Sequence, residues 1–125
     1  MAMHPTPVPP SAAPTLDDFE RIRRRGSEAT SKGAQAFLRL LSLAEQHDSG
    51  QARRVARFLA GTYNSEAFPW DCYDLRAVDE AISDDMLLCL DALRWGQADL
   101  HTLVPDGDRR LRELIAAWDL KWPEA

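Results

Sequence analysis

Apolar residues recur at steps of three and four through most of this chain, and this spacing most limits what it can fold into. Ala34, Phe37, Leu41 and Ala44 share one face of a helix, because an α-helix turns once every 3.6 residues. Runs that alternate β-branched and polar residues, which would predict strands, are absent from the sequence. We therefore predict an all-α fold, a compact bundle of about four to five helices with a disordered Pro-rich N-terminal tail.

Capping residues and helix breakers divide this pattern into separate elements. The predicted helices cover residues 16–25, 31–47, 50–63, 72–95 and 107–119. The T-x-x-D sequence from Thr15 to Asp18 has the form of a capping box, and Gly26 ends the helix that it starts. Either Asp48 or Ser49 caps the third helix, since both side chains can accept a hydrogen bond from a first-turn amide.

The stretch between the third and fifth helices is the least regular. Residues 65–70 form a corner in which Phe68 and Trp70 are too apolar for a free loop, so we expect them to plug one end of the core. Asp71 begins a D-x-x-D box, and we expect it to cap the fourth helix rather than bind a ligand. That helix is either continuous or divided by a hinge near residues 79–83. A later turn is expected to dock on the core through Leu100, Leu103 and Val104.

The inward-facing positions of these helices define the predicted core. Its members are Phe37, Leu41, Phe58, Leu59, Trp70, Leu75, Ile82, Met86, Leu90, Leu114 and Trp118. The second helix also turns Leu38 inward. Cys89 follows an apolar run and is expected to be a buried thiol, and with Cys72 it makes no disulfide framework. A core of this size is small, which leaves homo-oligomerisation open.

The first 14 residues contain five of the eight prolines. Proline lacks the N–H that helices and strands require, so we predict an extended tail at 1–14 and a single helical domain over 15–125. The sequence has neither an apolar leader nor a run of about 18 apolar residues. These features predict a cytoplasmic protein with no membrane contact and with reduced thiols.

Charge is distributed unevenly along the chain. Residues 1–62 hold nine Lys and Arg against six Asp and Glu, a balance of +3, whereas residues 63–125 hold six against fourteen, a balance of −8. The third helix presents a basic sector, formed by Arg53, Arg54 and Arg57. The fourth helix presents an acidic sector, formed by Asp79, Glu80, Asp84 and Asp85. Both sectors are candidate interaction faces.

Two charged clusters are candidates for binding phosphate or a divalent cation. Arg21, Arg23, Arg24 and Arg25 could contact phosphate, or they are solvated cations that suit a helix C-terminus. The acids around Glu80 and Asp84 could hold a divalent cation, but no EF-hand spacing is present, and pairing with arginines of the third helix or helix capping accounts for them. Nucleophile elbows, glycine-rich phosphate loops and His–Cys pairs are missing from the sequence. We therefore predict no catalytic residue, no metal and no cofactor.

Four motifs in the middle of the chain resemble those of one family. They are S-G-Q-x-R-R-V-A-x-F-L at 49–59, Y-N at 63–64, W-D-x-x-D-L at 70–75 and V-D-x-A-I-x-D-D-M at 78–86. On these motifs, residues 35–118 resemble a small domain family of unknown function, found in bacterial proteins and often encoded on integrative and conjugative elements or plasmids. The resemblance implies a proteobacterial, mobile-element and cytoplasmic setting, and it implies no activity or catalytic residue. Several members have Trp-Asn in place of Tyr63-Asn64.

Three functional hypotheses follow. The first is a non-enzymatic accessory protein of a bacterial mobile element that acts through protein–protein contacts with an unknown partner. The second is an acidic inhibitor that mimics nucleic acid and competes with it for a host nucleic-acid-binding or defence protein, as anti-CRISPR and anti-restriction proteins do. The third is a weak helix-turn-helix-like DNA-binding module built on residues 31–63. The net charge of −5 weighs against direct nucleic-acid binding.

Overall fold

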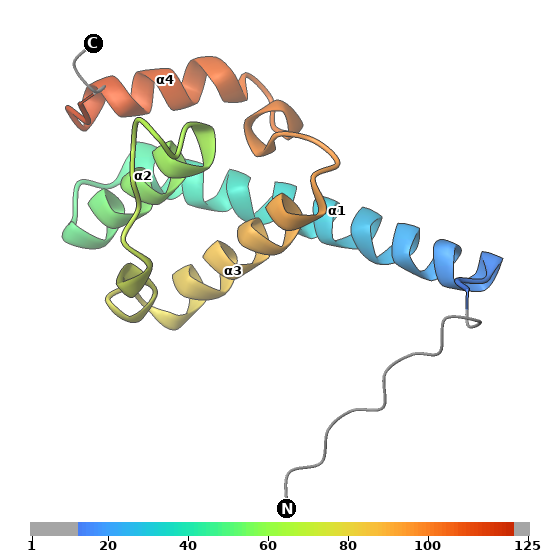
Figure 1. The fold of residues 1–125 in the computed structure, drawn as a ribbon. Helices are drawn as coiled ribbons and strands as arrows, with labels where there is room; N and C mark the ends of the chain where they lie inside the picture. The colour runs from blue at the N-terminus through green and yellow to red at the C-terminus, as the bar shows by residue number, and fades with distance from the viewer. Residues whose placement is uncertain (1–12, 122–125) are drawn as a thin grey trace, which may run out of the picture.

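The computed structural model describes residues 13–121, and every regular element in that range is helical (Figure 1). The elements in chain order are α1 (Leu16–Gln46), α2 (Gly50–Tyr63), the 3-10 helix η1 (Cys72–Arg76), α3 (Glu80–Trp95), the 3-10 helix η2 (Leu100–Leu103) and α4 (Gly107–Ala117). The predicted all-α class is confirmed. Residues 1–12 of the predicted tail lie outside the described residues.

Helix α1 is a single continuous element, so the prediction of two shorter helices there is wrong. Its start is as predicted, because Asp18 N–H donates to Thr15 Oγ1 at 3.2 Å and Thr15 N–H donates to Asp18 Oδ2 at 2.9 Å. Gly26 does not end the helix. It lies buried against α3, where a Cβ atom would come within 3.1 Å of the Trp95 ring. The missing side chain serves packing rather than a turn.

The most extensive contact in the fold joins α1 to α3, which run antiparallel. Gly26 meets Trp95 at the end of α3, Gly33 meets Ala92, and Arg39 reaches Asp85 nearer its start. Figure 1 shows α1 running the length of the molecule, with its N-terminal turns extending past α3. Helices α2 and α4 lie at the opposite, C-terminal end of α1.

The segment after α2 takes the divided form of the two predicted alternatives, with the break at residues 77–79. Asp71 caps η1 rather than a long helix, because its Oδ1 accepts from the Tyr73 N–H at 3.0 Å. Asp79 occupies the N-cap position of α3, but its side chain makes no capping bond. Instead Asp79 Oδ2 accepts from Gln51 Nε2 at 3.1 Å, and its backbone N–H donates to Gln51 Oε1 at 2.6 Å.

The predicted core residues all belong to one apolar cluster, although at different depths. Seven are buried, namely Phe37, Leu41, Phe58, Leu59, Ile82, Met86 and Leu114. Four others pack on the cluster while partly exposed, namely Trp70, Leu75, Leu90 and Trp118. Leu38 is exposed, contrary to prediction, whereas Leu40, which widens the predicted apolar stripe of this helix, is buried. The turn at η2 docks as expected, with Leu100 and Val104 buried.

Helix α4 closes the fold and ends at Ala117 rather than at residue 119. The Trp118 indole Nε1 donates to the Ala44 carbonyl at 3.2 Å, which ties the end of α4 to the end of α1. Tyr63 Oη donates to Asp108 Oδ1 at 2.8 Å, which ties the end of α2 to the start of α4. Among residues 13–121, no helix is both long and apolar enough to cross a membrane.

Candidate functional site

The three arginines of the predicted basic sector differ in their surroundings. Arg54 makes an ion pair with Asp74 of η1, whose side chain is otherwise almost inaccessible, since Asp74 is 4% exposed. Arg53 and Arg57 are exposed on α2 and make no ion pair within residues 13–121. Two of the three cations are therefore available to a partner, while Arg54 holds η1 against α2.

The predicted acidic sector is also divided. Asp85 turns toward α1, where Arg39 binds it with two hydrogen bonds of 2.8 and 3.1 Å. Asp79 turns toward Gln51 of α2. Glu80 and Asp84 remain on the outer face of α3, exposed and without an ion pair in the described part of the chain. The structure therefore does not gather the four carboxylates on one face.

The expected pairing of acids with the arginines of α2 is limited to one contact. Arg54 meets Asp74, whereas Asp85 of α3 pairs with Arg39 of α1, Asp91 pairs with Arg94 of α3 itself, and Glu80 and Asp84 stay in solvent. Arg39, which binds Asp85, carried no sequence signal that distinguished it from other surface arginines. Its role follows from the antiparallel packing of α1 on α3, which sets these two residues opposite each other.

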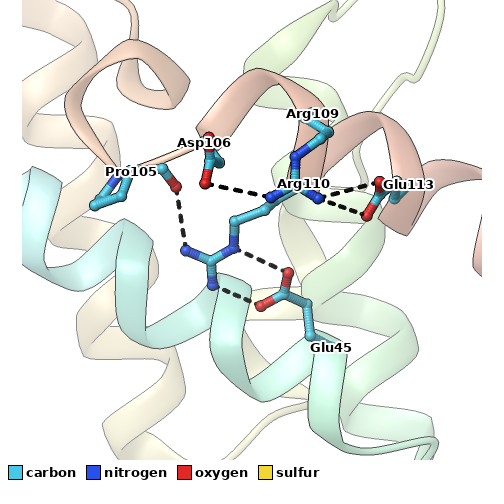
Figure 2. Close-up of polar contacts among 6 residues, drawn as sticks. All are labelled: Glu45, Pro105, Asp106, Arg109, Arg110 and Glu113. Atoms are coloured by element: carbon cyan, nitrogen blue, oxygen red, sulfur yellow. Dashed lines mark hydrogen bonds and ion pairs between the residues drawn. The ribbon is translucent and has the colours of Figure 1, made fainter.

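A cluster of ion pairs at the start of α4 joins this helix to α1 (Figure 2). Arg110 donates to both carboxylate oxygens of Glu45, at 2.6 and 3.0 Å, and to the Pro105 carbonyl at 3.4 Å. Arg109 pairs with Asp106 and Glu113 along α4. A hollow of about 360 Å³ lies beside this cluster. The arginines of this cluster are already paired with carboxylates, so the cluster stabilises the packing of α4 on α1.

An apolar groove lies between α2, the corner and α3. It has a volume of about 560 Å³, and its apolar lining comes from Phe58, Trp70, Leu90 and Leu93. An adjoining hollow of about 250 Å³ shares Leu93 and Thr62 with it and continues toward Leu100. Both helices pack on α1 but make few contacts with each other, and this leaves the groove open. Leu93 is 47% exposed there.

Trp70 gives this groove a polar feature. Its indole packs edge-on against Phe58, with ring centroids 4.9 Å apart. The indole Nε1 is buried and has no hydrogen-bond partner, alone among the buried side-chain nitrogen and oxygen atoms of residues 13–121. An unsatisfied buried N–H is costly, and such groups often mark a position where water or a ligand supplies the acceptor.

The remaining reactive groups of residues 13–121 include a buried thiol and an aromatic pair. Cys89 is buried, as predicted, and burial raises the pKa of its thiol to about 12. Its Sγ lies 3.8 Å from the Gly33 carbonyl. Tyr63 and His101 stack edge to face, with centroids 4.9 Å apart. No cluster of three or more His, Cys, Asp or Glu side chains suited to a metal occurs within the described range.

The groove was not predicted from the sequence. Phe68 and Trp70 were expected to plug the core, and Phe68 does so, being buried. Trp70 and Leu93 instead lie at an open edge. The number of apolar residues at the corner and at the end of α3 could have suggested an open groove. It is larger than one face of a short helix can bury.

The fold of residues 13–121 is thus a small helical domain with an apolar groove and with ion pairs that join α1 to α3, α2 to η1 and α4 to α1. The chain belongs to the family of unknown function DUF7673, whose model matches residues 34–119. This agrees with the resemblance over residues 35–118, but it bears on neither a bacterial origin nor a mobile element. No curated protein and no solved structure matches the chain.

Proposed function

We propose that this chain is a non-enzymatic accessory protein that acts by binding another protein through the groove between α2 and α3. The observation that carries the proposal is an apolar groove with Trp70 in its wall, whose buried indole N–H has no partner within residues 13–121. Such a surface suits an apolar side chain, and a small turn of the Trp70 ring on binding would let its N–H donate to an acceptor such as a backbone carbonyl. Leu93 is exposed to solvent in the free chain, and a bound partner would bury it in an apolar contact.

The charged residues at the two ends of the groove indicate which charges the partner segment carries. Glu66 lies at the Trp70 end and Asp99 at the far end, and both are exposed and free of ion pairs within residues 13–121. The partner segment is therefore apolar with Lys or Arg on either side. The resemblance to domains carried on conjugative elements and plasmids supports a bacterial, cytoplasmic, mobile-element setting for this interaction.

The test is co-purification from the source organism under nuclease treatment. Trp70→Phe keeps an aromatic ring, although a smaller one, and removes the N–H, and Leu93→Ser removes the apolar contact. Both variants should lose a nuclease-resistant partner that the unaltered chain retains. Leu87→Ser is the matched control, because Leu87 is 52% exposed on α3 and lies outside the groove. Equal recovery of the partner with all three variants would rule out the groove.

A DNA-binding module is the second candidate, and the exposed Arg53 and Arg57 favour it. It requires a DNA complex that weakens steeply with salt and is lost in an Arg53→Glu/Arg57→Glu chain. The adjacent Arg54 must be left intact in this test, since it pairs with Asp74. Tight DNA binding at low salt that depends on these arginines would overturn the accessory function.

The acidic inhibitor rests on Glu80 and Asp84, the two acids of its sector without ion pairs in residues 13–121. It requires that the chain displace nucleic acid from a host protein and that Glu80→Lys/Asp84→Lys abolish the displacement. A partner that is retained by this variant and lost by Trp70→Phe would favour the groove instead.

A further inference from the structure

The packing face of α1 continues beyond the helix that it packs on. Phe19, Ile22, Gly26, Ala29 and Gly33 follow a seven-residue repeat, with steps of three and four. From Gly26 onward these positions are buried beneath α3 and its neighbours. Among residues 13–121 no other element covers the N-terminal turns of α1, which extend past α3 in Figure 1. On the same face in these turns Phe19 is 58% and Ile22 43% exposed. We call residues 16–25 the overhang.

The overhang lies outside residues 34–119, the part matched by the family model. Its helix is nevertheless well founded, because the Thr15–Asp18 capping box holds its first turn. The hydrogen bonds from Thr15 lower the pKa of Asp18, so this carboxylate stays ionised in neutral solution. The overhang is thus an ordered amphipathic helix with one apolar face left open.

Charge along the overhang has a definite polarity. Asp17, Asp18 and Glu20 occupy its first half. The second half holds four arginines, Arg21, Arg23, Arg24 and Arg25. Two such helices in parallel would set like charges beside each other, whereas two in antiparallel orientation set each acidic half against the partner's basic half. This pattern is self-complementary, as a two-fold symmetric contact requires.

We propose that a second copy of this chain covers the overhang, forming a two-fold dimer in which the two α1 helices pair antiparallel. Phe19 of one copy packs against Ile22 of the other, and the reverse. On one edge Asp18 lies near the other copy's Arg25, and on the opposite edge Glu20 lies near the other copy's Arg23. Asp18, Arg23 and Arg25 flank the apolar face in the seven-residue repeat, and Glu20 lies one position farther round, within reach of the long arginine side chain.

The register also accommodates the rest of both molecules. With Phe19 opposite Ile22, residue Gly26 of one copy comes level with Thr15 of the other. Because α3 and the residue Gln97 beyond it meet α1 at Arg25 and Gly26 and then onward, each α3 ends close to the level at which the other copy's helix begins. Each α1 then has its apolar face covered throughout, by its own α3 and by the other copy's overhang. A ten-residue contact is small, so the dimer is a reversible one.

Sedimentation and light scattering of the full chain, over concentrations up to about 1 mM, test this directly. We expect a concentration-dependent monomer–dimer equilibrium. Phe19→Ser/Ile22→Ser should remain monomeric over the whole range with an unchanged melting temperature, whereas Leu87→Ser should dimerise like the unaltered chain. A monomer at every concentration overturns the proposal. So does a fall in melting temperature on Phe19→Ser/Ile22→Ser without any change in mass, since a segment of the same chain would then cover the face.

A charge exchange tests the antiparallel register. Glu20→Lys sets a lysine against the other copy's Arg23, and Arg23→Glu sets a glutamate against the other copy's Glu20. Each variant alone should dimerise about tenfold more weakly, since two contacts per dimer change from attraction to repulsion. An equimolar mixture of the two should restore the original affinity through heterodimers. Both variants also lose the charge pair between positions 20 and 23 of the same helix, and mixing the chains cannot restore that pair. Failure of the mixture to recover would therefore contradict this register.

Discussion

At the scale of single residues, the two cysteines occupy opposite environments. Cys72 is exposed at the start of η1, whereas Cys89 lies inside the α1–α3 contact. Burial is the largest cause of the raised pKa of Cys89, and the nearby Asp85 carboxylate adds to it. Because the thiolate is the nucleophile, a thiol with a pKa near 12 is unreactive at neutral pH.

We therefore predict that native protein at pH 8 takes up one equivalent of iodoacetamide, at Cys72, and that denatured protein takes up two. Intact mass and peptide mapping measure this, and Cys72→Ser should take up none when folded. Since the pKa of Cys89 is higher than the usual 9.0, its contribution to stability is complete below about pH 9 and is lost as pH rises toward 12. Modification of native Cys89 at pH 8 would contradict its burial.

The second prediction at this scale concerns the buried carboxylate of Asp74. Arg54→Ala leaves it without its cation, so the free energy of unfolding should fall by about 1–3 kcal/mol. The solvent around the partly exposed Arg54 keeps the loss below that of a fully buried pair. Urea denaturation measures it, and the controls Arg53→Ala and Arg57→Ala should stay within about 0.5 kcal/mol of the unaltered chain. An equal loss of unfolding free energy in all three variants would contradict a structural role for the Arg54–Asp74 pair.

At the scale of elements, the α1–α3 contact depends on the size of one residue. A Cβ on Gly33 would lie 2.3 Å from the Cβ of Ala92 and 3.0 Å from the Leu88 carbonyl oxygen. Glycine inside a helix costs about 1 kcal/mol relative to alanine, so the close approach of the two helices outweighs that cost here. Gly50, at the start of α2, has no neighbour within 4 Å of its would-be Cβ.

We predict that Gly33→Ala lowers the free energy of unfolding by about 1–3 kcal/mol, because α1 and α3 must separate. Gly50→Ala, the same change in open space, should be neutral or slightly stabilising. Thermal and urea denaturation of both variants check this. Adding Ala92→Gly to Gly33→Ala should recover part of the loss, and an unaffected Gly33→Ala protein would mean that the helices are less closely packed than described.

At the scale of the whole molecule, α1 belongs to two regions. Its C-terminal part contributes Phe37, Leu40 and Leu41 to the core. Its middle, residues 26–33, is buried against the second half of α3 and the residues that follow it, with Gly26 beside Trp95 and Gln97 and Gly33 beside Ala92. The family match begins at residue 34 and so leaves out this middle part.

A chain of residues 34–121 should therefore melt about 5–10 °C below a chain of residues 13–121 when both are monomeric. The contact that it loses includes Trp95, which packs against Gly26 and lies beneath Arg25. Its tryptophan emission should shift to longer wavelength as this indole meets water. Identical melting curves would show that residues 26–33 add nothing to the stability of the domain.

Local features of the sequence determined much of this fold. The Thr15–Asp18 box, the Ser49 cap and α2 over 50–63 are as predicted, because a cap and its amides lie within one turn of each other. The all-α class and the burial of Phe37, Phe58 and Met86 are likewise confirmed. An apolar face must be buried in any compact arrangement of these helices, so its residues can be identified before the arrangement is known.

Tertiary packing decided the rest. Gly26 has the local signature of a helix end, yet α1 continues because Trp95, distant in sequence, fills the space beside it. The pairing of Arg54 with Asp74 and of Arg39 with Asp85 likewise depends on which helix lies opposite which. The groove at Trp70 exists because α2 and α3 both pack on α1 rather than on each other. These contacts are set by side-chain shape across elements far apart in the chain, and local periodicity carries no information about them.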